Sequence, residues 1–338
     1  MTATRPVRRA LAATLMVAVA VGVALGLAEG MTRLFLPAFD PSGRFEFRHR
    51  VGSLSLGQPH TEQRQVKNTG DYDVAVSINR HGLRDAGDIA EATADDLVVV
   101  GDSVAWGWGV EAPDRFSNRL QSMTGRRVFN LATPTDLAGY EALLAYAESL
   151  GARIGRIVVA VSLETDLGSY DAAAERAEDQ TQTADWKQWL TERSAAYLLL
   201  TTMVHQVPGL KALAVQAGAI VPNLEGLARN SYDAEAIEAS AAKLQALSRR
   251  YRLLVVLIPS RALWVGDNRA VEDRIHTALV AALAARGVAV LDLRPPFEAG
   301  GAPLGFHFAN DGHWNARGHR LAAEAIARCL AGGTQICP

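Results

Sequence analysis

The segment VVVGDSVAWGWGV, residues 98–110, places a serine directly after a run of β-branched residues. Such a run predicts a buried strand, and Gly101-Asp102-Ser103 predicts a sharp turn from that strand into a helix. A serine there exposes its hydroxyl and adds its own N–H to the free donors at the start of the helix. Because a serine hydroxyl is a weak nucleophile at neutral pH, chemistry at Ser103 requires a base from elsewhere in the chain.

The candidate base lies far along the chain, in NDGHWNARGHRLAAEAIARCL. There Asp311 and His313 fall on a loop before the last predicted helix. The carboxylate can orient the histidine ring through one nitrogen while the other nitrogen takes the serine proton. A DxH sequence alone is more typical of capping and turns. Together with a serine at the same edge of a sheet, it predicts a triad of Ser103, His313 and Asp311.

The elements that must position these residues are five short apolar runs alternating with helical patterns. The runs are LVVVGDS, RRVFNLAT, RIVVAVSL, YRLLVVLIPS and GVAVLDLRPP, and the helix candidates are FSNRLQSM, YEALLAYAESL and residues 233–251, 271–286 and 316–330. Strands apolar on both faces and separated by helices predict an α/β fold, a three-layer α/β/α flavodoxin-like sandwich with five parallel strands. Ligands bind such sheets at the carboxyl ends of the strands, where Ser103 falls.

The N-terminus predicts a membrane segment. Arginines at positions 5, 8 and 9 precede an uncharged apolar run, residues 10–28, which is long enough to cross a bilayer. Cations before such a run predict that residues 1–9 stay in the cytoplasm and that residues 10–28 are a transmembrane signal anchor. The rest of the chain is then extracytoplasmic, in the periplasm, and a single pass holds it at the cell membrane. The alternative is a secreted protein whose signal peptide is cleaved near Gly26-Leu27-Ala28.

The remaining segments are predicted as a linker and small pre-domain extension (29–96), the α/β domain (97–330) and a C-terminal tail (331–338). YDVAVSIN in the extension alternates like an edge strand. Residues 167–232 carry no strand pattern and predict a helical insertion interrupted by prolines. This insertion could cap a site, lie near the membrane surface, or pack against the domain without a role in substrate binding.

Composition excludes some classes of function. The formal net charge is −2, and no basic run follows the first residues, which argues against a nucleic-acid partner. The only two cysteines, Cys329 and Cys337, are too few for a metal site, so none is predicted. In an oxidising compartment they would close a short loop by a disulfide, and the alternative is two free thiols.

GDSVAWGWGV and DGHWNARGH resemble the first and last sequence blocks of the SGNH, or GDSL, hydrolase superfamily, and INRHGLRD (78–85) resembles the segment before this domain in membrane-anchored members. The resemblance covers residues 97–330. It implies an esterase-type or acyl-transfer domain with Ser103 as nucleophile, His313 as base and Asp311 as its partner, without metal or organic cofactor.

The resemblance also implies an oxyanion hole, and there the chain departs from the family. The donors expected are the N–H of Ser103, the N–H of a glycine after the second strand and an asparagine side chain after the third. Thr135 and Thr165 stand at the last two positions. A backbone N–H survives this change, but a threonine hydroxyl is shorter than an asparagine amide. Either the substrate lies deeper in the site, or another group such as Glu164 or Asn130 is recruited, or the activity is low.

The position of the catalytic acid also differs from the pattern of many family hydrolases. Those proteins place the acid three residues before the histidine, where this chain has Asn310. The closer Asp311, followed by Trp314, resembles the DxHW arrangement of alginate O-acetyltransferase-like proteins, and VVLIPSRALW resembles a segment of the same group. These exported proteins move acetyl groups onto polysaccharides. The two readings share a triad and differ in whether water or a sugar hydroxyl accepts the acyl group.

Asp102, Trp106 and Trp314 are candidate pocket residues beside the triad, although Trp106 and Trp108 equally suit packing of the first helix against the sheet. Arg84 suits either an anionic group or a salt bridge that fastens the extension to the domain.

The function predicted is an extracytoplasmic serine ester hydrolase acting on an O-acylated envelope glycan or other surface ester, with the membrane as partner through the N-terminal helix. The alternatives are an O-acyltransferase with the same triad and a non-catalytic glycan-binding or scaffold protein with an impaired oxyanion hole.

Overall fold

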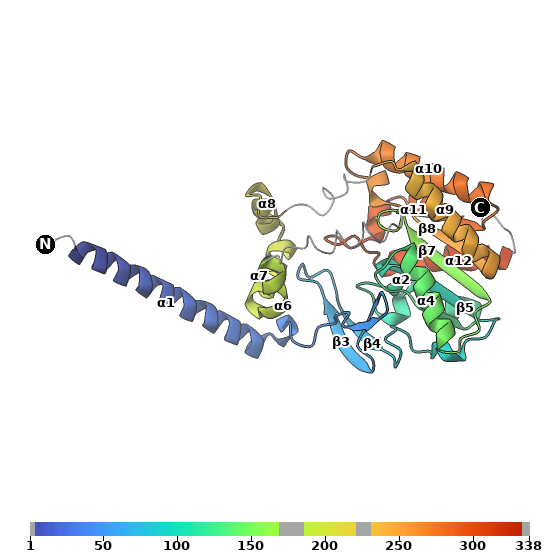
Figure 1. The fold of residues 1–338 in the computed structure, drawn as a ribbon. Helices are drawn as coiled ribbons and strands as arrows, with labels where there is room; N and C mark the ends of the chain where they lie inside the picture. The colour runs from blue at the N-terminus through green and yellow to red at the C-terminus, as the bar shows by residue number, and fades with distance from the viewer. Residues whose placement is uncertain (1–3, 169–185, 221–230, 333–338) are drawn as a thin grey trace. The chain divides into compact units, whose positions relative to one another are not determined.

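The computed structural model describes residues 4–168, 186–220 and 231–332 of the 338-residue chain. These residues form two compact units. The first is drawn from residues 1–43, 68–70 and 182–217, and the second from the rest of the chain (Figure 1).

The second unit is built on a five-stranded parallel sheet in the order β6-β5-β7-β8-β9. Its strands are β5 (Leu97–Gly101), β6 (Val128–Asn130), β7 (Arg156–Ser162), β8 (Arg252–Ile258) and β9 (Val290–Asp292). Each arises from one of the five predicted apolar runs, and the predicted α/β class is confirmed. In this strand order, Ser103 follows the carboxyl end of the central strand β5.

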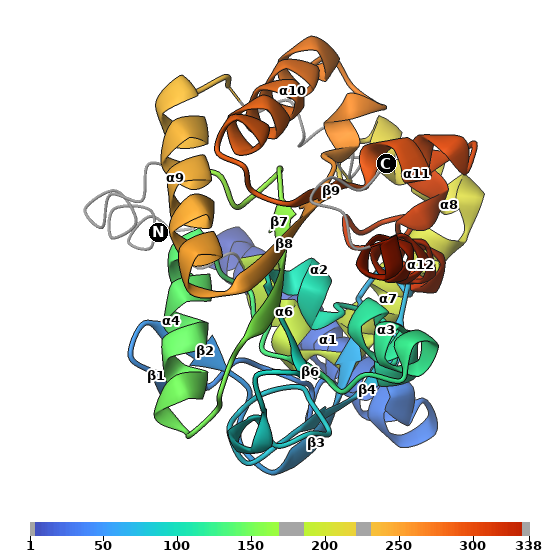
Figure 2. The same ribbon diagram turned by 90° about the vertical axis from the view of Figure 1, so that its right-hand side faces the viewer.

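Helices cover both faces of the sheet (Figure 2). One face carries α4 (Leu137–Ser149), α9 (Ala234–Arg250) and α10 (Arg269–Ala285), and the other α3 (Phe116–Thr124), α11 (Arg294–Ala299) and α12 (Ala316–Gly332). Along β5 the side chains alternate, with Val98 and Val100 in the first core and Val99 in the second. This alternation buries both faces of the strands, as the uninterrupted apolar runs require.

Short elements connect these layers. They are α2 (Ser103–Trp106) and the 3-10 turns η2 (Ile89–Glu91), η3 (Ala112–Asp114), η5 (Arg261–Leu263) and η6 (Pro303–Phe306). A further 3-10 turn, η1 (Pro37–Phe39), belongs to the first unit. The helix α12 ends at Gly332, two residues into the predicted tail. Cys329 on α12 is disulfide-bonded, whereas Cys337 lies outside the described residues.

The pre-domain extension forms two hairpins of its own. β1 (His49–Val51) pairs with β2 (Leu54–Leu56), and β3 (Thr61–Val66) pairs antiparallel with β4 (Asp73–Ile78). The alternating YDVAVSIN segment is therefore a strand, but it belongs to a separate two-stranded sheet and is no edge of the main one. The buried Arg84 fastens this region through the backbone carbonyls of Gly107, Val110 and Ala75, where the sequence suggested a salt bridge.

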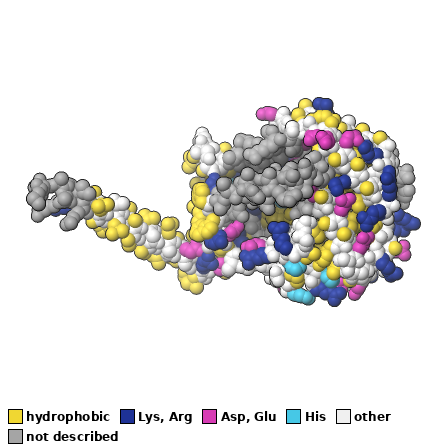
Figure 3. All heavy atoms as spheres, viewed as in Figure 1, with side chains coloured by type: hydrophobic (Ala, Val, Ile, Leu, Met, Phe, Trp, Pro, Cys, Tyr) yellow, Lys and Arg dark blue, Asp and Glu magenta, His cyan; other side chains and the backbone are white. Residues whose placement is uncertain are grey.

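The first unit contains α1 (Thr4–Phe35), α6 (Trp186–Arg193), α7 (Ala195–Gln206) and α8 (Pro208–Gln216). Residues 9–35 of α1 are long and apolar enough to cross a membrane, as an anchor or as a signal sequence, and Figure 3 shows exposed hydrophobic side chains along this helix. The helix runs beyond the predicted 10–28 because Glu29 and Arg33 pair one turn apart. The described part of the predicted insertion is helical, and residues 169–185 and 221–230 of it lie outside the described residues.

Glu29 also joins α1 to α7. Its carboxylate accepts hydrogen bonds from the Ser194 hydroxyl at 2.8 Å and from the Ala195 and Ala196 N–H groups, each at 3.0 Å. An acceptor at a helix N-terminus satisfies donors that have no partner within the helix. Glu29, the acidic residue that interrupts the apolar N-terminal sequence, therefore caps the first N–H groups of α7 from outside, together with the N-cap residue Ser194.

Candidate active site

The structure brings Ser103, His313 and Asp311 together at the carboxyl end of β5. The Ser103 Oγ lies 2.8 Å from the His313 Nε2. The other ring nitrogen, Nδ1, is hydrogen-bonded to the Asp311 Oδ1, which also accepts the His313 backbone N–H at 3.0 Å. A proton on Nδ1 directed at a carboxylate leaves the lone pair of Nε2 facing the serine hydroxyl.

The turn that presents Ser103 depends on its two preceding residues. A Cβ on Gly101 would lie 2.5 Å from the Ala105 side chain and 3.0 Å from a backbone oxygen, so only glycine fits there. Asp102 caps α2 by accepting from the Val104 N–H at 2.9 Å. Burial raises the pKa of Asp102 to about 6, although the backbone N–H groups of Val104 and Ala105 oppose this shift. Asp102 therefore acts locally as a helix cap rather than as a residue facing open solvent.

The loop between Asp311 and His313 is held by a second pair of residues that sequence reasoning did not connect. Arg261, after β8, forms an ion pair with Glu164, after β7, at 3.0 Å. A Cβ on Gly312 would lie only 2.5–2.8 Å from the Arg261 guanidinium. A side chain at position 312 would therefore have to displace the end of the Arg261 side chain, which is held by Glu164.

The second oxygen of Asp311 is occupied by the β3–β4 hairpin. Lys67 Nζ lies 2.6 Å from the Asp311 Oδ2, and the Tyr72 hydroxyl donates to the same oxygen at 3.3 Å. Trp108 donates from Nε1 to the Tyr72 hydroxyl at 2.6 Å and stacks on the His313 ring, with centroids 5.2 Å apart and planes inclined by 17°. Nothing in the sequence distinguishes Lys67 or Tyr72 from other polar residues of the extension.

These contacts set the charges of the cluster. Burial on its own would raise the pKa of Asp311, but the hydrogen bond and charge of His313, together with Lys67, hold it well below its usual range. Burial, and next the neighbouring Asp311 carboxylate, raise the pKa of Tyr72. Asp311 is therefore an anion and Tyr72 a neutral donor at neutral pH.

Thr165 lies exposed after β7, and its hydroxyl is 2.9 Å from the Asp166 Oδ1. Asp166 is buried and also accepts from the Tyr140 hydroxyl at 2.6 Å and the Ser162 N–H at 2.7 Å. Burial, with the neighbouring Asp102, raises the pKa of Asp166 well above its usual value. The Thr165 hydroxyl donates its hydrogen to Asp166, so it would have to turn from this partner to serve an oxyanion.

The other oxyanion candidates differ in how they are held. Thr135 precedes α4, and Gly139 gives its side chain room, since a Cβ there would lie 1.8 Å from the Thr135 Oγ1. The Asn130 amide already donates to the Ala105 carbonyl and the Ser117 hydroxyl, at 2.8 and 2.9 Å. Glu164 is an acceptor for Arg261. Neither Asn130 nor Glu164 is thus arranged to donate to an oxyanion.

Two of the candidate pocket residues belong to the core. Trp106 and Trp314 are 2% and 1% exposed. Trp106 packs against Phe45 and Phe47 of the extension, and Trp314 packs against Phe297 of α11. Packing is therefore their role, and the half-buried Trp108 is the tryptophan that contacts the candidate triad. Within the described ranges, no group of three His, Cys, Asp or Glu side chains is placed to hold a metal ion.

Comparisons with known proteins add to this geometry. Among curated proteins, no sequence matches the chain. Of the solved structures, a lipolytic protein of the G-D-S-L family from Veillonella parvula shares 13% identity, with 70% of this chain and 98% of that one covered and a TM-score of 0.42. A catalytic mutant of an acetylxylan esterase from Geobacillus stearothermophilus shares 12%, covering 72% and 97%, with a TM-score of 0.40.

The match to a family model is more specific. Residues 220–336, which include Asp311 and His313 but not Ser103, match the family described as SGNH hydrolase-like domain, acetyltransferase AlgX. The resemblance to SGNH hydrolases predicted from the sequence is thus confirmed by this match over residues 220–336.

Proposed function

We propose that this protein is a membrane-anchored serine ester hydrolase whose α/β domain acts outside the cytoplasm on an O-acylated envelope glycan or another surface ester. The observation that carries the proposal is the 2.8 Å approach of the Ser103 Oγ to the His313 Nε2, with Asp311 on the opposite ring nitrogen. This is the relation between nucleophile, base and orienting acid that covalent acyl chemistry requires.

In the first half-reaction, Ser103 Oγ attacks the acyl carbon while His313 Nε2 takes its proton. Asp311 stabilises the imidazolium that forms, and His313 then gives the proton to the departing alkoxide, which leaves an acyl-serine and an alcohol. The N–H of Ser103, the N–H of Thr135 and the hydroxyl of Thr165 are the proposed donors to the oxyanion. In the second half-reaction His313 activates the acceptor, and water as acceptor releases the free acid.

An O-acyltransferase is the second candidate, and a specific observation favours it. The family model that matches residues 220–336 is described as an acetyltransferase domain. In this reaction a sugar hydroxyl replaces water as the acceptor, with the same three residues in the same roles. Trp108, stacked on His313 and only half buried, would then lie where an acceptor sugar ring approaches.

The proposed location follows from α1. Arginine at its N-terminal end and an apolar stretch over residues 9–35 support a signal anchor with the α/β domain outside the cytoplasm. Protease added to intact cells or spheroplasts should degrade the α/β domain, and the mature chain should begin at its first residues. A mature N-terminus after Ala28 would instead establish cleavage and secretion.

Catalysis is tested with the full chain in detergent, using p-nitrophenyl acetate and an acetylated xylo-oligosaccharide. Ser103→Ala and His313→Ala should abolish turnover, while Ser122→Ala, an exposed serine on α3, should leave it unchanged. Mass spectrometry should find acetyl on the Ser103 peptide of the wild-type chain. Failure of both substrates to acylate Ser103 would reject both enzyme functions and favour the non-catalytic scaffold.

The two enzyme functions are separated by adding an unacetylated oligosaccharide acceptor to the same reaction. A hydrolase releases acetate whether or not the acceptor is present. A transferase moves acetyl onto the acceptor, and release of acetate falls as the acceptor concentration rises.

A further inference from the structure

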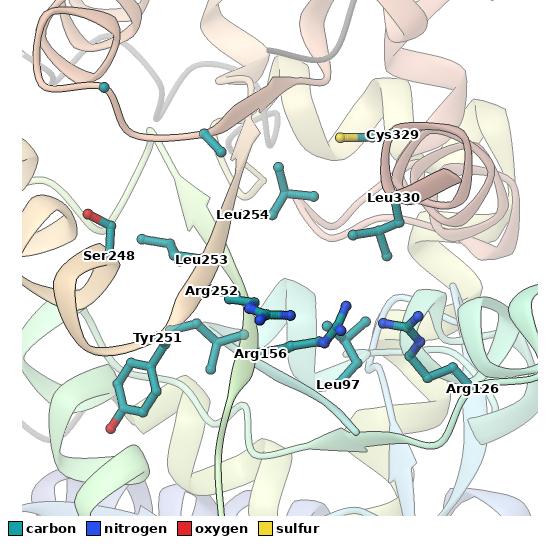
Figure 4. Close-up of a pocket in the computed structure, with 13 residues that line it drawn as sticks. Leu97, Arg126, Arg156, Ser248, Tyr251, Arg252, Leu253, Leu254, Cys329 and Leu330 are labelled. Carbon is teal, nitrogen blue, oxygen red and sulfur yellow. The ribbon is translucent and has the colours of Figure 1, made fainter. Parts of the chain in front are cut away.

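The amino-terminal edge of the parallel sheet, opposite the edge that carries Ser103, contains a cavity of about 520 Å³. Its lining comes from the first residues of β5, β7 and β8 and from the ends of α9 and α12. Three arginines, Arg126, Arg156 and Arg252, lie along one side, and Figure 4 shows Leu254, Leu330 and Cys329 on the other. Among the described residues that line it, none is acidic.

The three arginines are close in the fold because of strand register. Arg156 and Arg252 are directly paired across β7 and β8, so both side chains lie on the same face of the sheet. Arg126 comes from the turn between α3 and β6. Like charges directly opposite on neighbouring strands destabilise a sheet unless an anion or solvent compensates them.

Neighbouring arginines are neutralised, and these three are not. Arg127, Arg250 and Arg286 have carboxylate partners in Glu91, Glu148 and Glu238. In the described part of the chain, the side chains of Arg126, Arg156 and Arg252 have neither an ion pair nor a hydrogen bond, and the buried Nε of Arg156 is without a partner. Arg126 and Arg252 are exposed and Arg156 is half-buried, so an anion bound among them would replace the water that now solvates their guanidinium groups.

We propose that this cavity binds an oxyanion, a phosphate or carboxylate group, carried by a molecule with a compact apolar portion. Guanidinium groups match both oxyanions through paired N–H donors. Leu97, Leu253 and Leu254 supply an apolar wall, and a cavity of this size suits a small organic ligand. The site lies at the opposite end of the strands from Ser103 and does not depend on the proposed catalytic function.

The test is calorimetric titration of the detergent-solubilised full chain at constant ionic strength. The probes are phenyl phosphate, benzoate, inorganic phosphate and, as a neutral control, benzyl alcohol. We expect one saturable site for phenyl phosphate or benzoate, and the tighter of the two identifies the oxyanion. Binding of inorganic phosphate as tight as phenyl phosphate would support the anion site and overturn the apolar part of the proposal.

Arg156→Gln and Arg252→Gln should each weaken binding about tenfold or more, the loss expected for a hydrogen bond to a charged group. Arg249→Gln, an exposed arginine of α9 outside the cavity, is the matched control and should not alter the affinity. Circular dichroism verifies that each variant is folded. No saturable binding of either anion, equal binding of benzyl alcohol, or equal affinity in the Arg156→Gln and Arg249→Gln variants would overturn the proposal.

Discussion

Asp311 is held on both carboxylate oxygens, and the two oxygens face different parts of the chain. Oδ1 contacts His313, whereas Oδ2 contacts Lys67 and Tyr72 of the hairpin. The Lys67 cation offsets part of the negative charge that the histidine faces. If the triad operates as proposed, Lys67 holds the acid in position beside the base.

Lys67→Met should lower kcat/KM about tenfold, the loss expected for a charge-assisted hydrogen bond. The measurement is kcat/KM with p-nitrophenyl acetate as the substrate.

Lys67→Arg, which retains a cation, is the matched control and should keep kcat/KM close to that of the wild type. Equal kcat/KM in Lys67→Met and the wild type would contradict a role of Lys67 in positioning Asp311.

Of the proposed oxyanion donors, Thr165 is the one that a substitution tests most directly, because the resemblance predicts an asparagine amide at its position. Thr165→Val keeps the shape of the side chain and removes the donor, so kcat should fall about a hundredfold with little change in KM. Thr165→Ser, which retains the hydroxyl, should remain active. Equal kcat in the valine and serine variants, measured with p-nitrophenyl acetate, would exclude Thr165 from the oxyanion hole.

The β3–β4 hairpin takes part in the candidate site as well as in the extension. Besides Lys67 and Tyr72, it contributes Gln65, whose buried side chain accepts the Gly109 N–H at 2.8 Å. The glycine-rich turn after Ser103 is thus tied to residues that precede the α/β domain in the chain. An α/β domain beginning at residue 97 would lack these contacts.

In the first unit, α1 and α7 are linked by the hydrogen bonds that Glu29 accepts at the start of α7. Glu29→Ala should remove the cap of α7 and speed amide hydrogen exchange at residues 195–198 about fivefold, which corresponds to the loss of about 1 kcal/mol typical of an N-cap. Glu29→Gln retains an acceptor and should change exchange less. Esterase activity should not change in either variant. Unaltered exchange in Glu29→Ala would show that the cap does not stabilise α7.

Across the α/β unit as a whole, buried histidines couple stability to pH. Burial lowers the pKa of His307 to about 4 and that of His319 to about 3, from an ordinary 6.5. Between pH 6.5 and these values the unfolded chain binds more protons, so both groups reduce the free energy of unfolding as pH falls. The raised pKa of Asp102 acts in the opposite direction over part of this range, because there the folded state binds the extra proton.

The effect of His319 can be measured by comparing how the free energy of unfolding depends on pH in the wild type and in a His319→Gln variant. His319→Gln removes one of the groups that oppose folding in acid. The variant should therefore lose less free energy of unfolding than the wild type when the pH is lowered from about 7.5 to about 5, as measured by urea unfolding followed by tryptophan fluorescence. The same pH dependence in both proteins would contradict the assignment of acid sensitivity to His319.

The sequence by itself determined the layered α/β architecture, since strands buried on both faces must be apolar throughout and the helices between them must carry one apolar stripe. It also placed Ser103, Asp311 and His313 near one another, because parallel strands bring the residues at their carboxyl ends to one edge. Both results follow from the hydrophobic periodicity of the sequence and from the order of its strands and helices, which can be read without knowing any tertiary contact.

Only the tertiary structure decided which side chains surround those three residues. Lys67 and Tyr72 reach Asp311, and Arg261 packs on Gly312, through contacts between segments far apart in the sequence. The burial of Trp106 and Trp314 was likewise decided by neighbours from the extension and from α11. No local pattern encodes such contacts, because a side chain's partner depends on how whole elements pack.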